Sequence, residues 1–177
     1  KTLTYYPKKI EQFKQLIFHF NNSDIKFSIK SGECSYDGKS INSRNSNVTV
    51  SLKNFNKIIN INKKNNTVNV QAGAKIKDIS LILKKINYTI SAIPGGEHIT
   101  IGGAVSANVI GKDSNKIIGA FGDNVKSITV MTHNGNIGHY KKNSKIFKSF
   151  IGSFGLFGII LEVELILKKE VLVNQKI

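Results

Sequence analysis

The sequence predicts an α+β fold with two lobes, the second built mostly of antiparallel sheet. Apolar residues recur at helical spacing in two segments of the first half, whereas several other segments alternate between apolar and polar residues as strands do. The second half contains Asn134-Gly135, the dipeptide that most strongly indicates a tight β-hairpin. We expect the first lobe to span about residues 1–90 and the second about residues 91–177.

The first half is expected to contain two helices with short strands between them. Pro7 suits the first turn of a helix, and the apolar residues that follow it fall on one face as far as Phe20. Helical spacing returns between Ile76 and Leu83. Alternation predicts strands over residues 27–29, 48–52, 58–61 and 67–71.

The second half is expected to be mainly strand, with glycine clusters that interrupt the chain between residues 93 and 125. The patterns predict strands over residues 125–132, 137–140 and 159–167, and a helical turn over residues 146–151. The first two of these strands flank the Asn-Gly dipeptide, so we expect them to pair as a hairpin.

The charge of the chain favours anionic partners without identifying one. The 26 basic and 11 acidic residues leave a formal net charge of +15. Arg44 is the only arginine, and because the reading of base edges favours arginine, we expect no specific nucleic-acid partner. A non-catalytic basic module that binds nucleic acid or an anionic membrane surface stays an alternative. No apolar run is long enough to span a bilayer and no leader is visible, so we expect a bacterial cytoplasmic protein.

The metal-binding residue types are sparse. Cys34 is the only cysteine, which excludes an internal disulfide and a cysteine-based zinc site. The four histidines match no standard ligand spacing, and we expect no metal site.

The most informative stretch is the glycine-rich middle of the chain, residues 93–125. Glycine lets backbone approach a neighbouring group closely, and free N–H groups in such loops hold phosphate oxygens. Gly102-Gly103 is expected to begin a short helix whose N-terminus faces an anion. The alternative is an antiparallel protein with ordinary turns. The patterns G-x-G-x-x-G and G-x-x-x-x-G-K-[ST] are both missing, which excludes a Rossmann or P-loop site.

Five segments of the chain carry short motifs in a fixed order. They are residues 30–36 (K-S-G-E-C-S-Y), 70–74 (V-Q-A-G-A), 94–125 (from P-G-G to G-D-N-V), 132–138 (T-H-N-G-N-I-G) and 147–160 (ending in G-L-F-G-I-I). In this order they closely resemble the vanillyl-alcohol-oxidase (PCMH-type) family of FAD-binding domains. Within that family the likeness is to the decaprenylphosphoryl-ribose oxidases and to sugar- and alditol-oxidising members.

The resemblance implies that FAD lies between two lobes. The first segment would wrap the pyrophosphate with backbone N–H groups and the Ser35 hydroxyl, and the glycine-rich segment would lie beside the ribityl chain and the flavin. Ile159 and Ile160 would meet the adenine end. The implied cofactor-binding residues are Ser31, Gly32, Glu33, Cys34, Ser35, Tyr36, Pro94, Gly95, Gly96, Ile99, Gly102, Gly103, Ala107, Gly111, Ile159 and Ile160.

Three residues depart from the family pattern. Glu33 replaces a glycine of the pyrophosphate loop, and its charge would repel a pyrophosphate unless it points to solvent or the loop is altered. Cys34 stands where many relatives attach the flavin through histidine, so a histidyl link is impossible. We expect a buried, inert thiol and non-covalent FAD, with a cysteinyl link as the alternative. Ile110 replaces a histidine of the sugar-oxidising relatives, which leaves the substrate open.

The resemblance implies an FAD-dependent oxidoreductase that oxidises an alcohol group, of a sugar or polyol, by hydride transfer to the flavin. In the family, a separate substrate domain completes the site, and we expect the small-molecule substrate to bind there rather than to this chain alone. No residue of this chain is identified as the catalytic base. The alternative within the family is the FAD domain of a 2-hydroxyacid dehydrogenase.

Overall fold

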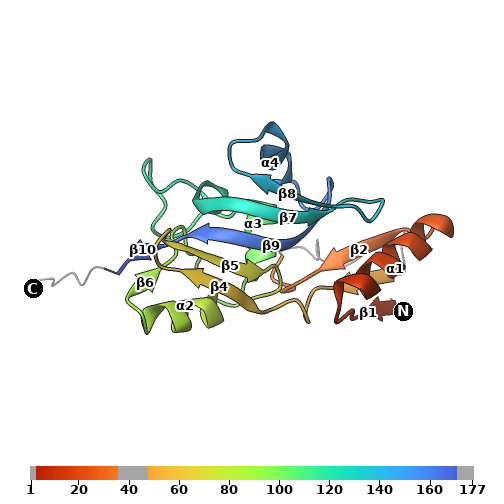
Figure 1. The fold of residues 1–177 in the computed structure, drawn as a ribbon, viewed down its shortest axis with the longest axis horizontal. Helices are drawn as coiled ribbons and strands as arrows, with labels where there is room; N and C mark the ends of the chain where they lie inside the picture. The colour runs from red at the N-terminus through yellow and green to blue at the C-terminus, as the bar shows by residue number, and fades with distance from the viewer. Residues whose placement is uncertain (1–2, 36–47, 171–177) are drawn as a thin grey trace, which may run out of the picture.

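The computed structural model describes residues 3–35 and 48–170, which form a three-stranded, a five-stranded and a small two-stranded β-sheet (Figure 1). Four α-helices accompany the sheets in these residues. The arrangement confirms the predicted α+β class. None of the described helices is long and apolar enough to cross a bilayer.

The three-stranded sheet is parallel and has the order β1-β3-β2. Its strands are β1 (Leu3–Tyr5), β2 (Phe27–Lys30) and β3 (Val48–Ser51). The sequence predicted β2 and β3, whereas β1 was missed because three residues are too short for alternation to be recognised. This sheet ends at Lys30, where the loop with the predicted pyrophosphate contacts begins.

Helix α1 (Ile10–Asn22) follows β1 and packs against the three-stranded sheet. The Gln12 side chain begins the helix by accepting hydrogen bonds from the backbone N–H groups of Lys8 and Lys9, at 2.8 and 3.2 Å. The apolar face meets the sheet through Phe20, whose ring centroid lies 5.6 Å from that of Tyr5 and 5.2 Å from that of Phe27. The predicted apolar face of this helix is therefore confirmed.

The five-stranded sheet is antiparallel throughout and has the order β4-β5-β9-β7-β8. Its strands are β4 (Ile58–Asn62), β5 (Thr67–Gln71), β7 (Val125–Met131), β8 (Ile137–Lys141) and β9 (Ile159–Ile166). The central strand β9 joins the hairpin β4-β5 to the hairpin β7-β8. Strands from both sides of residue 90 thus share one sheet, and the division into lobes at that residue stays a prediction.

The hairpin predicted at Asn134-Gly135 is confirmed. Strands β7 and β8 pair in antiparallel register, and the N–H of Thr132 donates to the carbonyl of Asn136 at 2.9 Å. Gly135 has a φ of +78°, a conformation that glycine adopts without strain.

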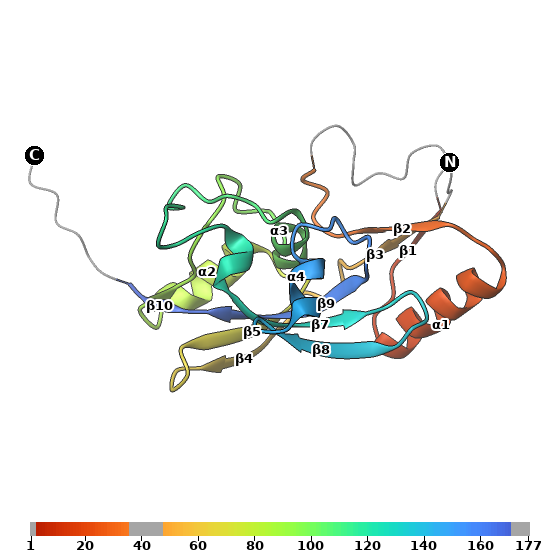
Figure 2. The same ribbon diagram turned by 90° about the horizontal axis from the view of Figure 1, so that it is seen from above.

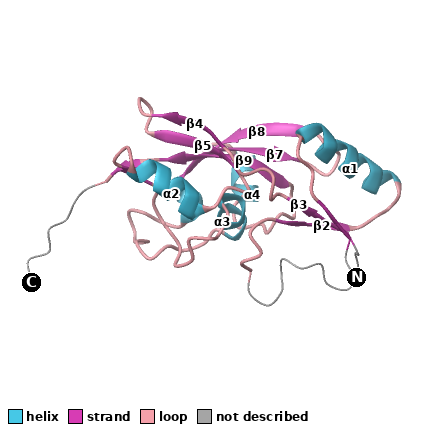
Figure 3. Ribbon diagram, turned by 90° about the horizontal axis from the view of Figure 1, so that it is seen from below, coloured by secondary structure: helices cyan, strands magenta, loops and turns pink. Residues whose placement is uncertain are grey.

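Helices α2 (Ile76–Lys84) and α3 (Ile101–Ala107) lie on one side of the five-stranded sheet (Figure 2), and the same arrangement is seen from below (Figure 3). Beyond them are β6 (Tyr88–Thr89), which pairs with β10 (Lys168–Lys169), a 3₁₀ turn at Phe121–Asn124, and α4 (Lys145–Phe150). The sheet buries an apolar face made of Val68, Val70, Ile128, Val130, Val163 and Leu165. This core holds α3 at the centre of the molecule.

Glu164 lies on the opposite, polar face of β9 and gives the sheet a pH-dependent contact. Its carboxylate accepts hydrogen bonds from Lys126 Nζ at 3.1 Å and Ser127 Oγ at 2.9 Å. Partial burial alone would raise the pKa of Glu164, but these bonds, with one from Thr67, outweigh it and lower the pKa below 4.5.

A lowered pKa in the folded state means that the Glu164 contacts stabilise the fold above the ordinary carboxyl pKa, and that this stabilisation is lost as the pH falls toward the lowered value. We expect Glu164→Gln to be less stable than the wild type at neutral pH and to lose less stability on acidification below about pH 4.5. Urea midpoints measured across that range test this, with the exposed Glu11→Gln on α1 as the control. Parallel pH curves for Glu164→Gln and the wild type would contradict it.

Candidate cofactor-binding site

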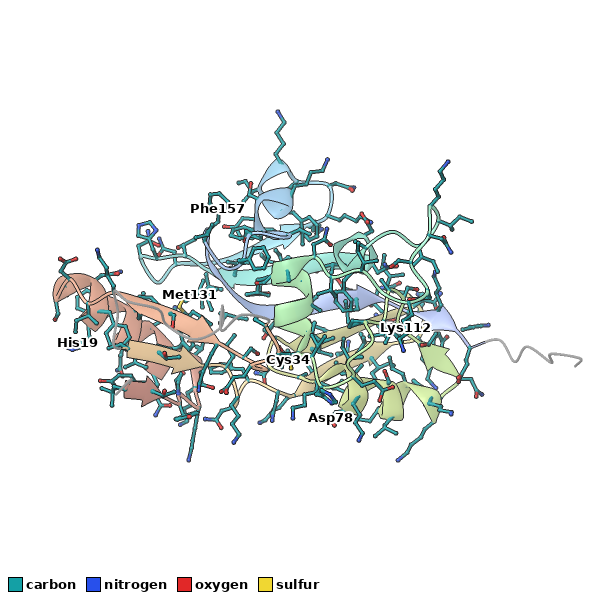
Figure 4. All side chains as sticks on the ribbon, turned by 180° about the vertical axis from the view of Figure 1, so that it is seen from behind. His19, Cys34, Asp78, Lys112, Met131 and Phe157 are labelled. Carbon is teal, nitrogen blue, oxygen red and sulfur yellow. The ribbon has the colours of Figure 1, made fainter. Side chains whose placement is uncertain are left out.

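Two segments far apart in the sequence meet beside α3. A Cβ on Gly32 would lie 3.0 Å from Thr100 Cγ2 and 3.3 Å from the Thr100 nitrogen. The Cys34 thiol lies 3.9 Å from the carbonyl oxygen of His98. The loop after β2 therefore packs against the residues that lead into α3, and Figure 4 shows Cys34 close to that helix. The structure brings together the first and third of the five motif segments.

The loop after β2 has hydrogen-bonding groups that the described part of the chain does not use. None of the backbone N–H groups from Gly32 to Ser35 donates to another described residue. Among the described residues, Ser31 Oγ is a buried side-chain oxygen with no hydrogen-bond partner. A buried hydroxyl without a partner is costly, and a phosphate oxygen beside Ser31 Oγ would give it one. Groups of this kind fit a pyrophosphate.

Cys34 departs from the expectation of a buried thiol. Its side chain is exposed, and Sγ donates to the carbonyl of Gly32 at 3.1 Å. The buried-thiol interpretation is therefore wrong, because the loop runs along the surface at this point. Tyr36, the last residue of the predicted loop, lies outside the described residues.

Glu33 pairs with Lys30 and is largely exposed. Lys30 Nζ lies 2.7 Å from Glu33 Oε1, and the Glu33 side chain is 57% exposed. Its backbone φ is +56°, in the left-handed region that favours glycine. Of the two alternatives for this residue, the side chain adopts the solvent-facing one while the backbone keeps a glycine-like conformation.

The first turn of α3 is occupied by protein groups. The N–H of Ile101 donates to Ala74 O at 2.9 Å, and that of Gly102 donates to Ala72 O at 2.8 Å. Thr100 caps the helix by accepting from Gly103 N at 3.4 Å. The expected anion at the helix N-terminus is not supported by these bonds, because the N–H groups are already paired.

The glycine at 102 has a packing role instead. A Cβ there would lie 2.7 Å from the Ala72 Cβ, so the helix sits directly on the end of β5. Gly111 is similar, since a Cβ would lie 2.2 Å from the carbonyl carbon of Ala92. Both glycines allow close approach of chain to chain, and their contact with a cofactor stays a prediction.

The predicted Pro94-Gly95-Gly96 contact follows a turn held by Asp113, a residue that the sequence did not single out. The two Asp113 carboxylate oxygens accept from the N–H groups of Ala92 and Ile93, each at 3.0 Å. Lys112 N donates in turn to Ile93 O at 3.1 Å. The position of Asp113, two residues after Gly111, is the sequence feature that could have indicated its role.

We expect Asp113→Ala to destabilise the domain by about 2–3 kcal/mol, because two charge-assisted hydrogen bonds are lost and two N–H groups lose their acceptor. Thermal unfolding measures this, and FAD affinity should fall as the adjacent glycines become mobile. Asp113→Asn retains one acceptor oxygen and should show a smaller loss. Equal stability of Asp113→Ala and the wild type would contradict the anchoring role.

The C-terminal end of α3 meets the closing motif. Gly152 N donates to Val105 O at 3.1 Å, and Phe154 N donates to Ser106 O at 2.9 Å. Asn108 ends the helix in the left-handed conformation, and its side-chain oxygen accepts from Gly122 N at 2.9 Å. Helix α3 thus connects the loop after β2, at one end, with the closing motif at the other.

The remaining predicted residues differ in their surroundings. Ala107 is half-buried at the end of α3, and Ile99 is half-buried before its start. Ile159 and Ile160 lie in β9 opposite Met131 and Val130, with 8% and 5% of their surface exposed. Their side chains belong to the core, so a contact with a cofactor would use their backbone groups.

Two surface hollows lie apart from these residues, beside α1. The first has a volume of about 350 Å³ and is lined by Phe20, Asn21, Asp24, Ile25, Lys26 and Phe27. The second, of about 440 Å³, is lined by residues of α1 and of the β1–α1 connection. Neither is lined by a predicted cofactor-binding residue, and the unpaired groups near Ser31 are the better guide to the site.

Comparisons with known proteins agree with this geometry. A family described as "FAD binding domain" matches residues 2–140. Decaprenylphosphoryl-beta-D-ribose oxidase of Mycolicibacterium smegmatis is 28% identical over 117 residues, covering 64% of this chain and 25% of the relative. D-lactate dehydrogenase of Anaerostipes hadrus is 32% identical over 127 residues, covering 67% and 26%. An alkyldihydroxyacetonephosphate synthase structure has a TM-score of 0.82 at 19% identity, covering 94% of this chain and 34% of that one.

The chain spans about a quarter of the length of the curated relatives that it matches. The family match covers most of the described residues, including the loop after β2, the glycine-rich segment and the hairpin β7-β8. The structural match extends over nearly the whole chain, so the fold agrees with the sequence-based family. The chain therefore belongs to the FAD-binding domain family, with the PCMH-type fold of FAD-linked oxidases.

Proposed function

We propose that this chain holds FAD within an oxidoreductase that oxidises an alcohol carbon of a small molecule. The observation that carries the proposal is the loop after β2, where the buried Ser31 hydroxyl and the N–H groups of the next residues have no partner among the described residues. FAD supplies the chemistry, because its flavin accepts a hydride. The protein supplies binding, orientation and electrostatics.

In this proposal the pyrophosphate lies against Ser31 and the N–H groups of residues 32–35. The contact between Gly32 and Thr100 supports this placement, because it holds the loop against the segment before α3 while the loop N–H groups stay unpaired with other described residues. Residues 94–96, beside the Asp113 anchor, would lie along the ribityl chain and flavin, and the backbone of Ile159 and Ile160 would face the adenine.

We propose a sugar or polyol as the substrate class. The likeness to a decaprenylphosphoryl-beta-D-ribose oxidase favours it, whereas the likeness to a D-lactate dehydrogenase favours a 2-hydroxyacid. The side chains that face the substrate would come from the part of such proteins that this chain does not span. The bacterial cytoplasmic location and the absence of a specific nucleic-acid partner stay predictions.

The visible spectrum of the purified chain tests the proposal. We expect flavin absorption, either as purified or after FAD is added, and release of the flavin by acid because it is not covalently bound. A folded chain that neither contains nor binds FAD would contradict the function. Flavin that stays with acid-precipitated protein would contradict non-covalent binding and indicate a link through the exposed Cys34.

Turnover experiments separate the substrate classes. We expect the chain of 177 residues, loaded with FAD, to oxidise neither sugars nor hydroxyacids, since it spans only about a quarter of the length of its oxidoreductase relatives. A full-length gene product containing this chain, assayed on polyols, aldoses and D-lactate in parallel, should prefer the sugar substrates. A clear preference for D-lactate would support the alternative within the family.

A further inference from the structure

We propose that Glu33 weakens the affinity of the loop for the FAD pyrophosphate and that Lys30 offsets this effect, so that the pair sets how tightly the domain holds its cofactor. The inference rests on the proposed placement of the pyrophosphate at the loop after β2. It concerns the two charged side chains of the segment 30–35, where every other residue is uncharged.

The geometry ties the two charges together. Lys30 is the last residue of β2, and Glu33 follows three residues later in the loop. Lys30 Nζ and Glu33 Oε1 are 2.7 Å apart. The Lys30 side chain is only 19% exposed, whereas that of Glu33 is 57% exposed. The hydrogen bond with Glu33 raises the pKa of Lys30 against the opposing effect of its partial burial. Lys30 is therefore charged at neutral pH, and its ion pair among the described residues is with the Glu33 carboxylate.

The pair leaves the segment with no net charge. A pyrophosphate carries two negative charges, and a neutral loop attracts it only through hydrogen bonds. If Glu33 lost its charge, the Lys30 ammonium would be released and would attract the phosphates. If Lys30 lost its charge, the Glu33 carboxylate would be unpaired beside them and would repel them. The two substitutions are thus expected to change FAD affinity in opposite directions.

Two substitutions of Glu33 distinguish the effect of its charge from the effect of its backbone strain. A φ of +56° is unfavourable for a residue with a Cβ, so Glu33→Gly would remove both the charge and the strain. Glu33→Gln retains the Cβ and the side-chain length and removes the charge alone. Affinity differences between Glu33→Gln and the wild type therefore report electrostatics, and differences between Glu33→Gln and Glu33→Gly in thermal stability report the backbone.

The experiment is a titration of FAD into the flavin-free chain, followed by quenching of flavin fluorescence. We expect Glu33→Gln to bind FAD about fivefold more tightly and Lys30→Met about fivefold more weakly than the wild type, with the double variant close to the wild type. Raising the ionic strength should reduce the differences, because the pair lies near the surface. Glu11→Gln, an exposed acidic residue on α1, is the matched control and should change nothing.

Riboflavin, which has no phosphate, distinguishes the charge effect from a change in loop shape. Its affinity should be the same in all variants. The inference is overturned if Glu33→Gln binds FAD no better than the wild type, or if riboflavin binding shifts by the same factor. If Lys30→Met does not fold, Glu33→Gln alone decides the matter. If every variant is folded and none binds FAD, the proposed function fails, and this inference fails with it.

Discussion

Replacing Gly73 with alanine is expected to destabilise the domain strongly, because the added Cβ would overlap backbone atoms. The added Cβ would lie 2.2 Å from the carbonyl oxygen of Leu52 and 2.7 Å from that of Phe55. Both obstacles are backbone atoms, so no side-chain rotation relieves the overlap. Gly73 N also donates to Phe55 O at 2.7 Å, which fixes the distance between the two chain segments.

Movement of packed backbone costs about 3 kcal/mol or more, at the upper end of overpacking substitutions. For a domain of this size, we expect the melting temperature of Gly73→Ala to fall by about 6–12 °C. Gly96→Ala is the matched control, because its Cβ would meet only the Ile99 side chain at 3.6 Å and its φ is unstrained. Circular dichroism measures both, and similar melting temperatures for the two variants would refute the packing argument.

Gly73 belongs to a motif that was recognised in the sequence, but the physical reason for a glycine at this position came only from the structure. The V-Q-A-G-A segment resembles the family, but no role was predicted for Gly73, whereas Gly111 was expected to contact the cofactor. In the structure, Gly73 and Gly111 approach backbone of this same chain. Sequence spacing cannot distinguish the two roles, because both require only that no Cβ intervenes.

The secondary structure was largely predictable because each element has a local cause. Helix α1 follows from Pro7 and an apolar stripe, and the hairpin β7-β8 follows from Asn134-Gly135. Strand β1 was not predictable, since its pairing with β3 joins residues more than 40 positions apart and it has only three residues. The role of Asp113 was missed for a related reason, because its carboxylate accepts hydrogen bonds from N–H groups about 20 residues earlier in the chain.

Residues 31–35 form a loop, as predicted, but which of their hydroxyl groups is buried emerged only from the structure. The sequence suggested Ser35 as the hydroxyl that meets the pyrophosphate, and Ser35 is exposed. In the part of the chain that the structure describes, the buried hydroxyl without a partner is that of Ser31. Which of two nearby serines is buried depends on how the loop packs against Thr100, and residue order does not determine that contact.

Ser31→Ala is expected to stabilise the flavin-free domain while weakening its affinity for FAD. In the flavin-free protein, the Ser31 hydroxyl is buried and has no partner among residues 3–35 and 48–170, so its removal would relieve an unpaired polar group at little cost in packing. We expect a gain of about 1 kcal/mol and a rise in melting temperature of about 2–4 °C. When FAD is bound, the same hydroxyl would donate to a phosphate, and its loss should lower the affinity about tenfold.

The expected rise in stability and the expected fall in FAD affinity distinguish a ligand-binding Ser31 from a purely structural one. Ser28→Ala in the neighbouring strand β2 is the control, because Ser28 Oγ lies 3.3 Å from Thr49 Oγ1 and already has a partner. That variant should lose about 1 kcal/mol of stability and keep its FAD affinity. If Ser31 were a purely structural residue, both serine variants would be destabilised and neither would affect FAD. A Ser31→Ala protein that is more stable yet binds FAD as tightly as the wild type would place the pyrophosphate elsewhere.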